Sequence, residues 1–95
     1  MYKLKQSKSF YRAAYKLIKL RRISFSLFEE RLRILSINPF DKNLKTHKVN
    51  SKKIGLAYSS SLDADIRIIW SFDQEENLCI HLLDIGGHSG SNSVY

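Results

Sequence analysis

The sequence has a single cysteine, Cys79, among 95 residues, and this scarcity excludes several classes of protein. One thiol cannot form an internal disulfide, so a secreted disulfide-bonded scaffold is ruled out, as is a cysteine-based zinc site. The sequence also lacks an apolar run long enough for a signal peptide, or for the roughly 20 apolar residues of a membrane span. We therefore expect a cytoplasmic protein with no membrane partner.

Acidic residues are missing from the first 22 positions, which carry eight basic residues. The rest of the chain has a formal charge of −1, so this segment supplies the net charge of +7. A second basic run lies in the middle of the chain. Both runs fit either solvated faces of the protein or surfaces that bind a phosphate backbone. In the second case the RNA-binding residues are Lys8, Arg12, Lys16, Lys19, Arg21, Arg22, Lys45, Lys48, Lys52 and Lys53.

The first third of the chain has the spacing of two helices. Apolar residues recur at three- and four-residue intervals and predict a helix from Ser7 or Ser9 to about Arg21. A second helix is expected to begin with a capping box of Ser26 and Glu29 and to end before the only proline. The few residues between them favour an antiparallel helical hairpin.

Strands are expected on both sides of this hairpin. Apolar and polar residues alternate weakly over Tyr2–Gln6, which predicts a short first strand. The segment from the proline to position 53 is interpreted as a basic loop. Three further strands at about Ile54–Ser60, Asp65–Phe72 and Leu78–Asp84 are joined by short polar links, which favours an antiparallel meander. We predict one α+β domain over residues 1–95, with the helical hairpin on one face of an antiparallel or mixed sheet of about four strands.

Three histidines and one arginine are candidates for chemistry. His81 lies in a nearly continuous apolar strand, which favours a packed, hydrogen-bonded structural role. His47 in the basic loop and His88 after two glycines have no apolar pattern that explains them. Arg67 lies in the most sheet-like segment, where it must pair with a carboxylate, reach an edge, or line a site for an anion.

These side chains suit cleavage of RNA without a metal ion. A base must take the proton of a 2′-hydroxyl, an acid must protonate the leaving 5′-oxygen, and a cation must stabilise the phosphate. Histidine suits the first two tasks and arginine the third, while Tyr95 can stack on an unpaired base. The sequence has no glycine-rich phosphate loop, nucleophile elbow or histidine pair at zinc spacing. We expect no metal or small-molecule cofactor, and we interpret Cys79 as a small core hydrophobe.

The chain also carries short motifs in a characteristic order. They are Asn38–Asp41, Leu44–Val49, Gly55, Asp65–Trp70, Leu83–His88 and the terminal Val94–Tyr95. In this order and spacing the motifs resemble the RelE/ParE superfamily of bacterial toxins, and within it the YafQ-like, ribosome-dependent messenger-RNA endonucleases. The similarity extends over almost the whole chain.

The resemblance implies a fold, an activity and partners. It implies two helices on an antiparallel sheet, cleavage of messenger RNA in the ribosomal A site, and neutralisation by a small cognate antitoxin. It assigns proton transfer to His88 and His47. The implied catalytic set is completed by Asp65, by Arg67 on the phosphate, and by Tyr95 as the aromatic residue near the end.

The chain departs from the YafQ-like pattern at two positions. Ser61 stands where those proteins typically have a histidine, and Asp84 where they typically have an arginine. Two alternative functions therefore stay open: a ParE-like inhibitor of DNA gyrase, and a toxin without catalytic activity that is retained as an antitoxin-binding protein. The pair His47 and His88 favours the nuclease over the gyrase inhibitor, because a binding module has no need of paired proton donors.

Overall fold

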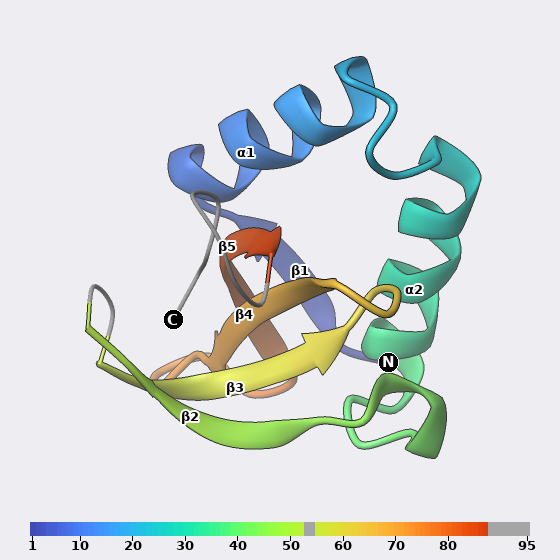
Figure 1. Cartoon of the computed structure of the whole chain (residues 1–95). Coiled ribbons are helices and arrows are strands. Elements are labelled where there is room, and N and C mark those ends of the chain that lie inside the picture. Colours follow the sequence, from blue (N-terminus) through green and yellow to red (C-terminus); the bar gives the residue numbers. More distant parts are fainter. Residues whose placement is uncertain (53–54, 88–95) are drawn as a thin grey trace.

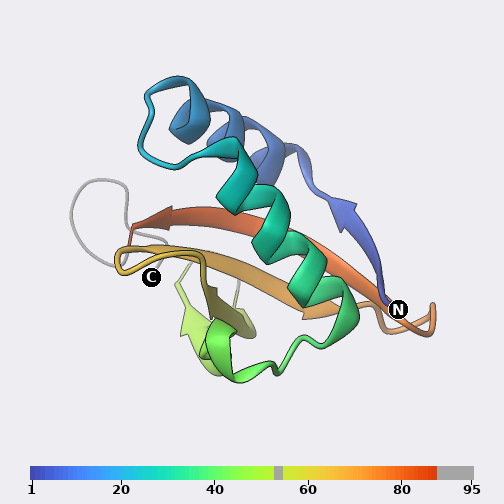
Figure 2. The same ribbon diagram turned by 90° about the vertical axis from the view of Figure 1, so that its right-hand side faces the viewer.

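The computed structural model describes residues 1–52 and 55–87 and places two helices on one face of a five-stranded sheet (Figures 1 and 2). The helices are α1 (Lys8–Lys19) and α2 (Phe25–Ile37), followed by the short 3-10 helix η1 (Lys42–Leu44). The strands are β1 (Lys3–Gln6), β2 (His47–Ser51), β3 (Gly55–Ser61), β4 (Ile66–Phe72) and β5 (Cys79–Gly87). Their order is β1-β5-β4-β3-β2, with β1 parallel to β5 and the other pairs antiparallel. The predicted α+β fold is confirmed, with five strands where about four were expected.

The additional strand is β2, which occupies part of the segment predicted to be a basic loop. It pairs with β3 from His47 opposite Ser59 to Ser51 opposite Gly55. Only Val49 among its residues is apolar, so the sequence carries no hydrophobic alternation there. Lysines and polar residues are typical of an edge strand, where they discourage pairing with other chains. The prediction of a loop was wrong because β2 is held by backbone pairing and contributes little to the core.

Each helix begins at a serine whose hydroxyl accepts a backbone hydrogen bond. The Oγ of Ser7 accepts from the N–H of Phe10 at 3.0 Å, which confirms one of the two predicted caps of α1. The cap of α2 is Ser24, whose Oγ accepts from the N–H of Leu27 at 3.1 Å. The predicted capping box was wrong, because Ser26 lies inside the first turn while Ser24 has the extended backbone that a cap requires. Within the described residues, no helix is long and apolar enough to cross a membrane.

The main core lies between the helices and the sheet. Side chains at i and i+2 of a strand share a face, so β4 and β5 each direct alternate apolar residues toward the helices. The buried residues of this core include Phe10, Leu17, Phe28, Leu35, Ile66, Ile68, Trp70, Ile80 and Leu82. Each such side chain contributes about 1.5–3 kcal/mol relative to an exposed one.

The opposite face of the sheet, here called the open face, is not covered by the two helices (Figure 2). It carries a smaller apolar cluster formed by Ala57, Ile69, Val49 and Leu83. Because β4 alternates, Arg67 and Ile69 face this side while Ile68 faces the helices. The sheet therefore divides the molecule into a packed side and a side that is available to a ligand.

A chain of buried and partly buried hydrogen bonds ties the central strand to the segment before β2. The indole N–H of Trp70 donates to Ser60 Oγ at 2.8 Å, and this oxygen lies 2.6 Å from Thr46 Oγ1. The Thr46 hydroxyl also donates to the carbonyl of Pro39 at 2.6 Å. These bonds fix the residue before His47 against the centre of the sheet.

The position of the α2 cap can be tested with two serine variants. Ser24→Ala removes the acceptor of a backbone N–H and should lower the free energy of unfolding by about 1 kcal/mol. Ser26→Ala, at an exposed position in the first turn of the helix, should change it by less than about 0.5 kcal/mol. Urea denaturation followed by circular dichroism measures both, and the reverse order of effects would restore the capping box of Ser26 and Glu29.

Candidate active site

Arg67 is the central residue of the open face. It lies in β4 between two core-facing isoleucines, so alternation turns its side chain away from the helices. Its Nε donates to the Oγ of the fully buried Ser59 at 3.0 Å, and its Nη2 donates to the carbonyl of Lys45 at 3.4 Å. A hydroxyl and a carbonyl thus hold a half-buried guanidinium in one orientation. Both acceptors are neutral, so they do not cancel the positive charge of the guanidinium, which can still bind an anion.

His47 lies beside this guanidinium although the two residues belong to strands that are not neighbours. Its Nδ1 is 3.3 Å from Arg67 Nη2 and 3.1 Å from the carbonyl oxygen of Lys45. β3 lies between β2 and β4, and His47 pairs with Ser59 while Ser59 pairs with Ile69. The long side chain of Arg67 therefore reaches across β3 to the imidazole, which is exposed.

The turn before β2 supplies the carbonyl that both side chains share. The carboxylate of Asp41 accepts from the N–H of Asn43 at 2.8 Å and begins η1, and the amide oxygen of Asn38 accepts from the N–H of Phe40 at 3.1 Å. Lys45 directly follows η1 and has a left-handed backbone (φ 49°, ψ 43°). Such a backbone is costly for a lysine and persists only where its surroundings hold it. The motif Asn38–Asp41 thus shapes the loop that delivers the Lys45 carbonyl to Arg67.

The two positions at which the sequence departs from the YafQ-like pattern flank Arg67. Ser61 pairs with Arg67 from β3, and its hydroxyl donates to the carbonyl of Asp63 at 2.7 Å. On β5, Asp84 pairs with Ile69, and Gly86, which has no side chain, pairs with Arg67. Both substituted positions therefore belong to the surroundings of this arginine, which leaves Arg67 as the cation among them.

Asp65 lies apart from this pair. It is in the turn before β4 and does not head the strand, and its carboxylate is 3.6 Å from the guanidinium of Arg22. Its N–H donates to the carboxylate of Asp63 at 2.9 Å. Both partners of the ion pair are about half exposed, and such pairs contribute between 0 and about 1 kcal/mol. The structure thus brings together His47 and Arg67 and places Asp65 at the helical side of the turn.

The basic residues fall into separate groups. Lys8, Arg12, Lys16 and Lys19 are exposed on α1, and Arg21 and Arg22 on the turn after it, over the packed face of the sheet. Lys45 and Lys52 are exposed near the ends of β2, and Lys48 pairs with Tyr58, which belongs to the main core, so Lys48 lies on the side opposite His47. Lys53, His88 and Tyr95 lie outside the described residues.

Four contributors to these surfaces were missed from the sequence. Ser59 and the Lys45 carbonyl hold Arg67, and a backbone carbonyl leaves no trace in a sequence. Tyr11 and Tyr15, about 60% exposed, lie among the bases of α1. Their i,i+4 spacing on the polar side of the helix was the signal that could have identified them.

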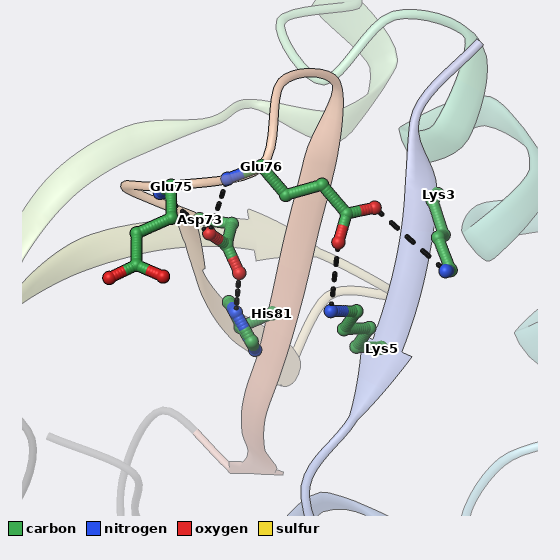
Figure 3. A network of polar contacts seen from close by, with 6 residues as sticks. All are labelled: Lys3, Lys5, Asp73, Glu75, Glu76 and His81. Carbon is green, nitrogen blue, oxygen red and sulfur yellow. Dashed lines mark hydrogen bonds and ion pairs between the residues drawn. The ribbon is translucent and has the colours of Figure 1, made fainter.

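A second polar cluster lies at the hairpin that joins β4 and β5 (Figure 3). His81 is hydrogen-bonded as expected, with its Nε2 2.5 Å from the carboxylate of Asp73. The backbone N–H of Glu76, the imidazole of His81 and the N–H of Glu75 hold the pKa of Asp73 well below its usual range. Glu76 also accepts a hydrogen bond from Lys5 at 3.0 Å, which lowers the pKa of the glutamate and raises that of the lysine.

Comparisons with known proteins identify the fold. No protein-family model matches the chain, and no curated protein does. A metal-bound toxin from Helicobacter pylori is 20% identical, with a TM-score of 0.74, over 93% of this chain and 96% of that one. A copper-bound mutant toxin from the same organism is 24% identical, with a TM-score of 0.69 over the same shares. The Escherichia coli DinJ-YafQ complex matches with 17% identity and a TM-score of 0.69, over 93% and 94%. The chain therefore has the RelE/YafQ fold, as the resemblance predicted.

The support of Arg67 by Ser59 can be tested by removing the hydroxyl. Ser59→Ala leaves the Nε of a half-buried guanidinium without its acceptor, so the free energy of unfolding should fall by about 1–3 kcal/mol. Ser9→Ala, at an exposed position of α1, should change it by less than about 0.5 kcal/mol. Equal stabilities of the two variants in urea denaturation would show that Ser59 does not hold the arginine.

Proposed function

We propose that this chain is the toxin of a toxin-antitoxin pair and that it cleaves messenger RNA on the ribosome, in the cytoplasm. The observation that carries the proposal is the 3.3 Å approach of His47 to Arg67 on the open face. A proton-transfer group beside a fixed cation supplies two of the three functions that metal-free cleavage of RNA requires. The shared fold with YafQ and with the Helicobacter pylori toxins supports a toxin role.

Arg67 is the group that binds the scissile phosphate. Its planar guanidinium can contact two phosphate oxygens and stabilise the charge that develops on them. In the free chain Nη2 points at the Lys45 carbonyl and at His47 Nδ1. A bound phosphate competes for these N–H groups, so binding draws Arg67 away from the imidazole.

This exchange prepares His47 to act as the base. Without Arg67 as a donor, Nδ1 carries the proton and donates to the Lys45 carbonyl, 3.1 Å away. Nε2 is then free to accept the proton of the 2′-hydroxyl. The 2′-oxygen bonds to phosphorus, the bond from phosphorus to the 5′-oxygen breaks, and His88 gives that oxygen its proton. The products are a 2′,3′-cyclic phosphate and a 5′-hydroxyl.

The remaining predicted residues have supporting roles in this proposal. His88 is the next residue in the sequence after β5, and its role as the acid rests on the resemblance. Tyr95 stacks on a base next to the cleaved bond, as the resemblance implies. We assign Asp65 to the turn, where it pairs with Arg22, and not to proton transfer.

The basic residues of α1 form a docking surface distinct from the cleavage site. They lie over the packed face of the sheet, whereas His47 and Arg67 lie on the open face. The exposed rings of Tyr11 and Tyr15 among these bases suit stacking on unpaired ribosomal-RNA bases. The chain would then hold the ribosome with its helical side and the messenger RNA with its open face.

The protein partner in this proposal is a cognate antitoxin. YafQ is found in a complex with DinJ, and this chain shares its fold. An acidic, amphipathic segment would complement the net charge of +7 and cover exposed apolar side chains of the helices.

The cleavage mechanism predicts losses of rate in two variants. Arg67→Gln removes the phosphate-binding cation and should slow cleavage of messenger RNA on programmed ribosomes by about 10²–10³-fold. His47→Ala removes the base and should slow it by about 10²–10⁴-fold. Arg33→Gln, which removes one exposed charge from α2, should cleave at the parent rate.

Parent-like rates in the first two variants would exclude the mechanism. Growth arrest that persists in both, together with inhibition of purified gyrase in a supercoiling assay, would favour the ParE-like alternative.

The docking surface predicts a specific salt dependence. The double variant Lys16→Gln, Lys19→Gln removes two charges from α1 and should reduce the slope of log K against log salt concentration by about two for ribosome binding. The matched variant Arg33→Gln, Lys42→Gln removes the same charge from α2 and η1 and should keep the parent slope. Equal slopes for the two double variants in sedimentation binding would show that α1 does not dock on RNA.

A further inference from the structure

Three side chains with different metal-binding atoms converge on the open face, at the end of the sheet away from Arg67. They are Asp73, Cys79 and His81, whose ligand atoms all lie within 4.8 Å of one another. Cys79 and His81 are two residues apart on β5 and therefore share a face. Asp73 directly follows β4, and its N–H donates to the carbonyl of Cys79 at 2.9 Å. The backbone of one hairpin thus fixes all three.

The surroundings of Cys79 are unusual for a core hydrophobe. The residue is 1% exposed, yet it belongs to neither the main core nor the apolar cluster of the open face. Lys3 of β1 pairs with Cys79, and Lys5 pairs with His81. A buried thiol among lysines, a carboxylate and an imidazole is not explained by apolar packing.

We propose that Asp73, Cys79 and His81 bind one zinc ion, with water in the fourth position. Zinc accepts thiolate, imidazole and carboxylate ligands and is usually tetrahedral. In such a centre the nitrogen and oxygen ligands lie about 3.3 Å apart. His81 Nε2 and Asp73 Oδ2 are now 2.5 Å apart, so they need to separate by less than about 1 Å. The side chain of His81 is 39% exposed and has room for this movement.

The charges around the site are compatible with a divalent cation. Glu76 lies 3.0 Å from the Lys5 ammonium and 3.8 Å from that of Lys3, so its carboxylate offsets one of the two lysine charges (Figure 3). The Cys79 thiolate and the Asp73 carboxylate then offset the two charges of zinc. The proton of the thiol leaves to solvent when the metal binds.

The site is accessible and separate from the cleavage site. A pocket of about 510 Å³ at the hairpin is lined by residues that include Asp73, Glu76 and Cys79. His81 lies five residues along β5 from Gly86, which pairs with Arg67. At about 3.3 Å per residue the two sites are about 16 Å apart. Variants at one site should therefore leave the other intact. A lone cysteine excludes a site built from several thiolates, but not a mixed site of this kind.

Cobalt(II) provides a spectroscopic test, because a thiolate bound to this metal gives a charge-transfer band in the near ultraviolet. The full chain, without a histidine tag and stripped with a chelator, is titrated with cobalt(II). The band should saturate at one ion per chain and disappear when zinc is added. Cys79→Ser should abolish the band. His81→Gln should weaken zinc binding by at least about 10-fold in calorimetry, since even the loss of a group behind a ligand weakens binding 10–100-fold.

His47→Gln is the matched control, because it removes a histidine from the cleavage site and should leave the band and the zinc affinity unchanged. Circular dichroism checks that each variant is folded, and Cys79→Ala replaces Cys79→Ser if the latter is not. The proposal is overturned if the parent gives no band, if Cys79→Ser keeps it, or if His47→Gln loses it.

Discussion

A charged side chain in the middle of the sheet determines how the polar groups around it on the open face are arranged. Arg67 stands between two buried isoleucines of β4, so its guanidinium cannot move toward the helices and must find polar partners on the open face. Ser59 and the Lys45 carbonyl meet this requirement. Because the Lys45 carbonyl also lies beside His47 Nδ1, the same contact that holds the arginine sets the position of the histidine.

One face of the sheet carries the core that stabilises the fold, and the other face carries the polar groups of the candidate sites. The helices and the alternate residues of β4 and β5 form a dense core on one face, and Trp70 extends this rigidity to the start of β2 through Ser60 and Thr46. The open face has only a small apolar cluster and so can carry polar groups at little cost to the core. Two such groups use it at opposite ends, the pair His47 and Arg67 at one end and the Asp73 cluster at the other. The basic helix α1 lies on the other side of the sheet.

The sequence predicted the elements that contribute strongly to the core and missed those that do not. The helices and β3, β4 and β5 were found because their apolar residues follow a helical or alternating period. β2 was missed because Val49 is its only apolar residue, and the start of α2 was displaced because Ser24 and Ser26 are equally good caps in a sequence. Backbone geometry determines both features, through the pairing of β2 with β3 and the extended backbone of Ser24.

The candidate site was predicted in part. His47 and Arg67 were both singled out, but their contact depends on a register across three strands that no local pattern encodes. Asp65 was expected at the head of β4 and lies in the turn, because the preceding Asp63 caps the strand by accepting the N–H groups of Asp65 and Ile66. The Lys45 carbonyl could not be predicted, since its direction follows from a left-handed backbone at the end of η1.

In the proposed function, messenger RNA contacts the open face while ribosomal RNA contacts α1. Photo-crosslinking on programmed ribosomes tests it directly, with a photoreactive amino acid placed at Ser61, opposite Arg67, or at Tyr15 on α1. A message with a 2′-deoxy nucleotide at the cleavage point keeps the complex intact. We expect position 61 to attach to the A-site codon and position 15 to ribosomal RNA. Attachment of the codon to position 15, with none at position 61, would contradict it.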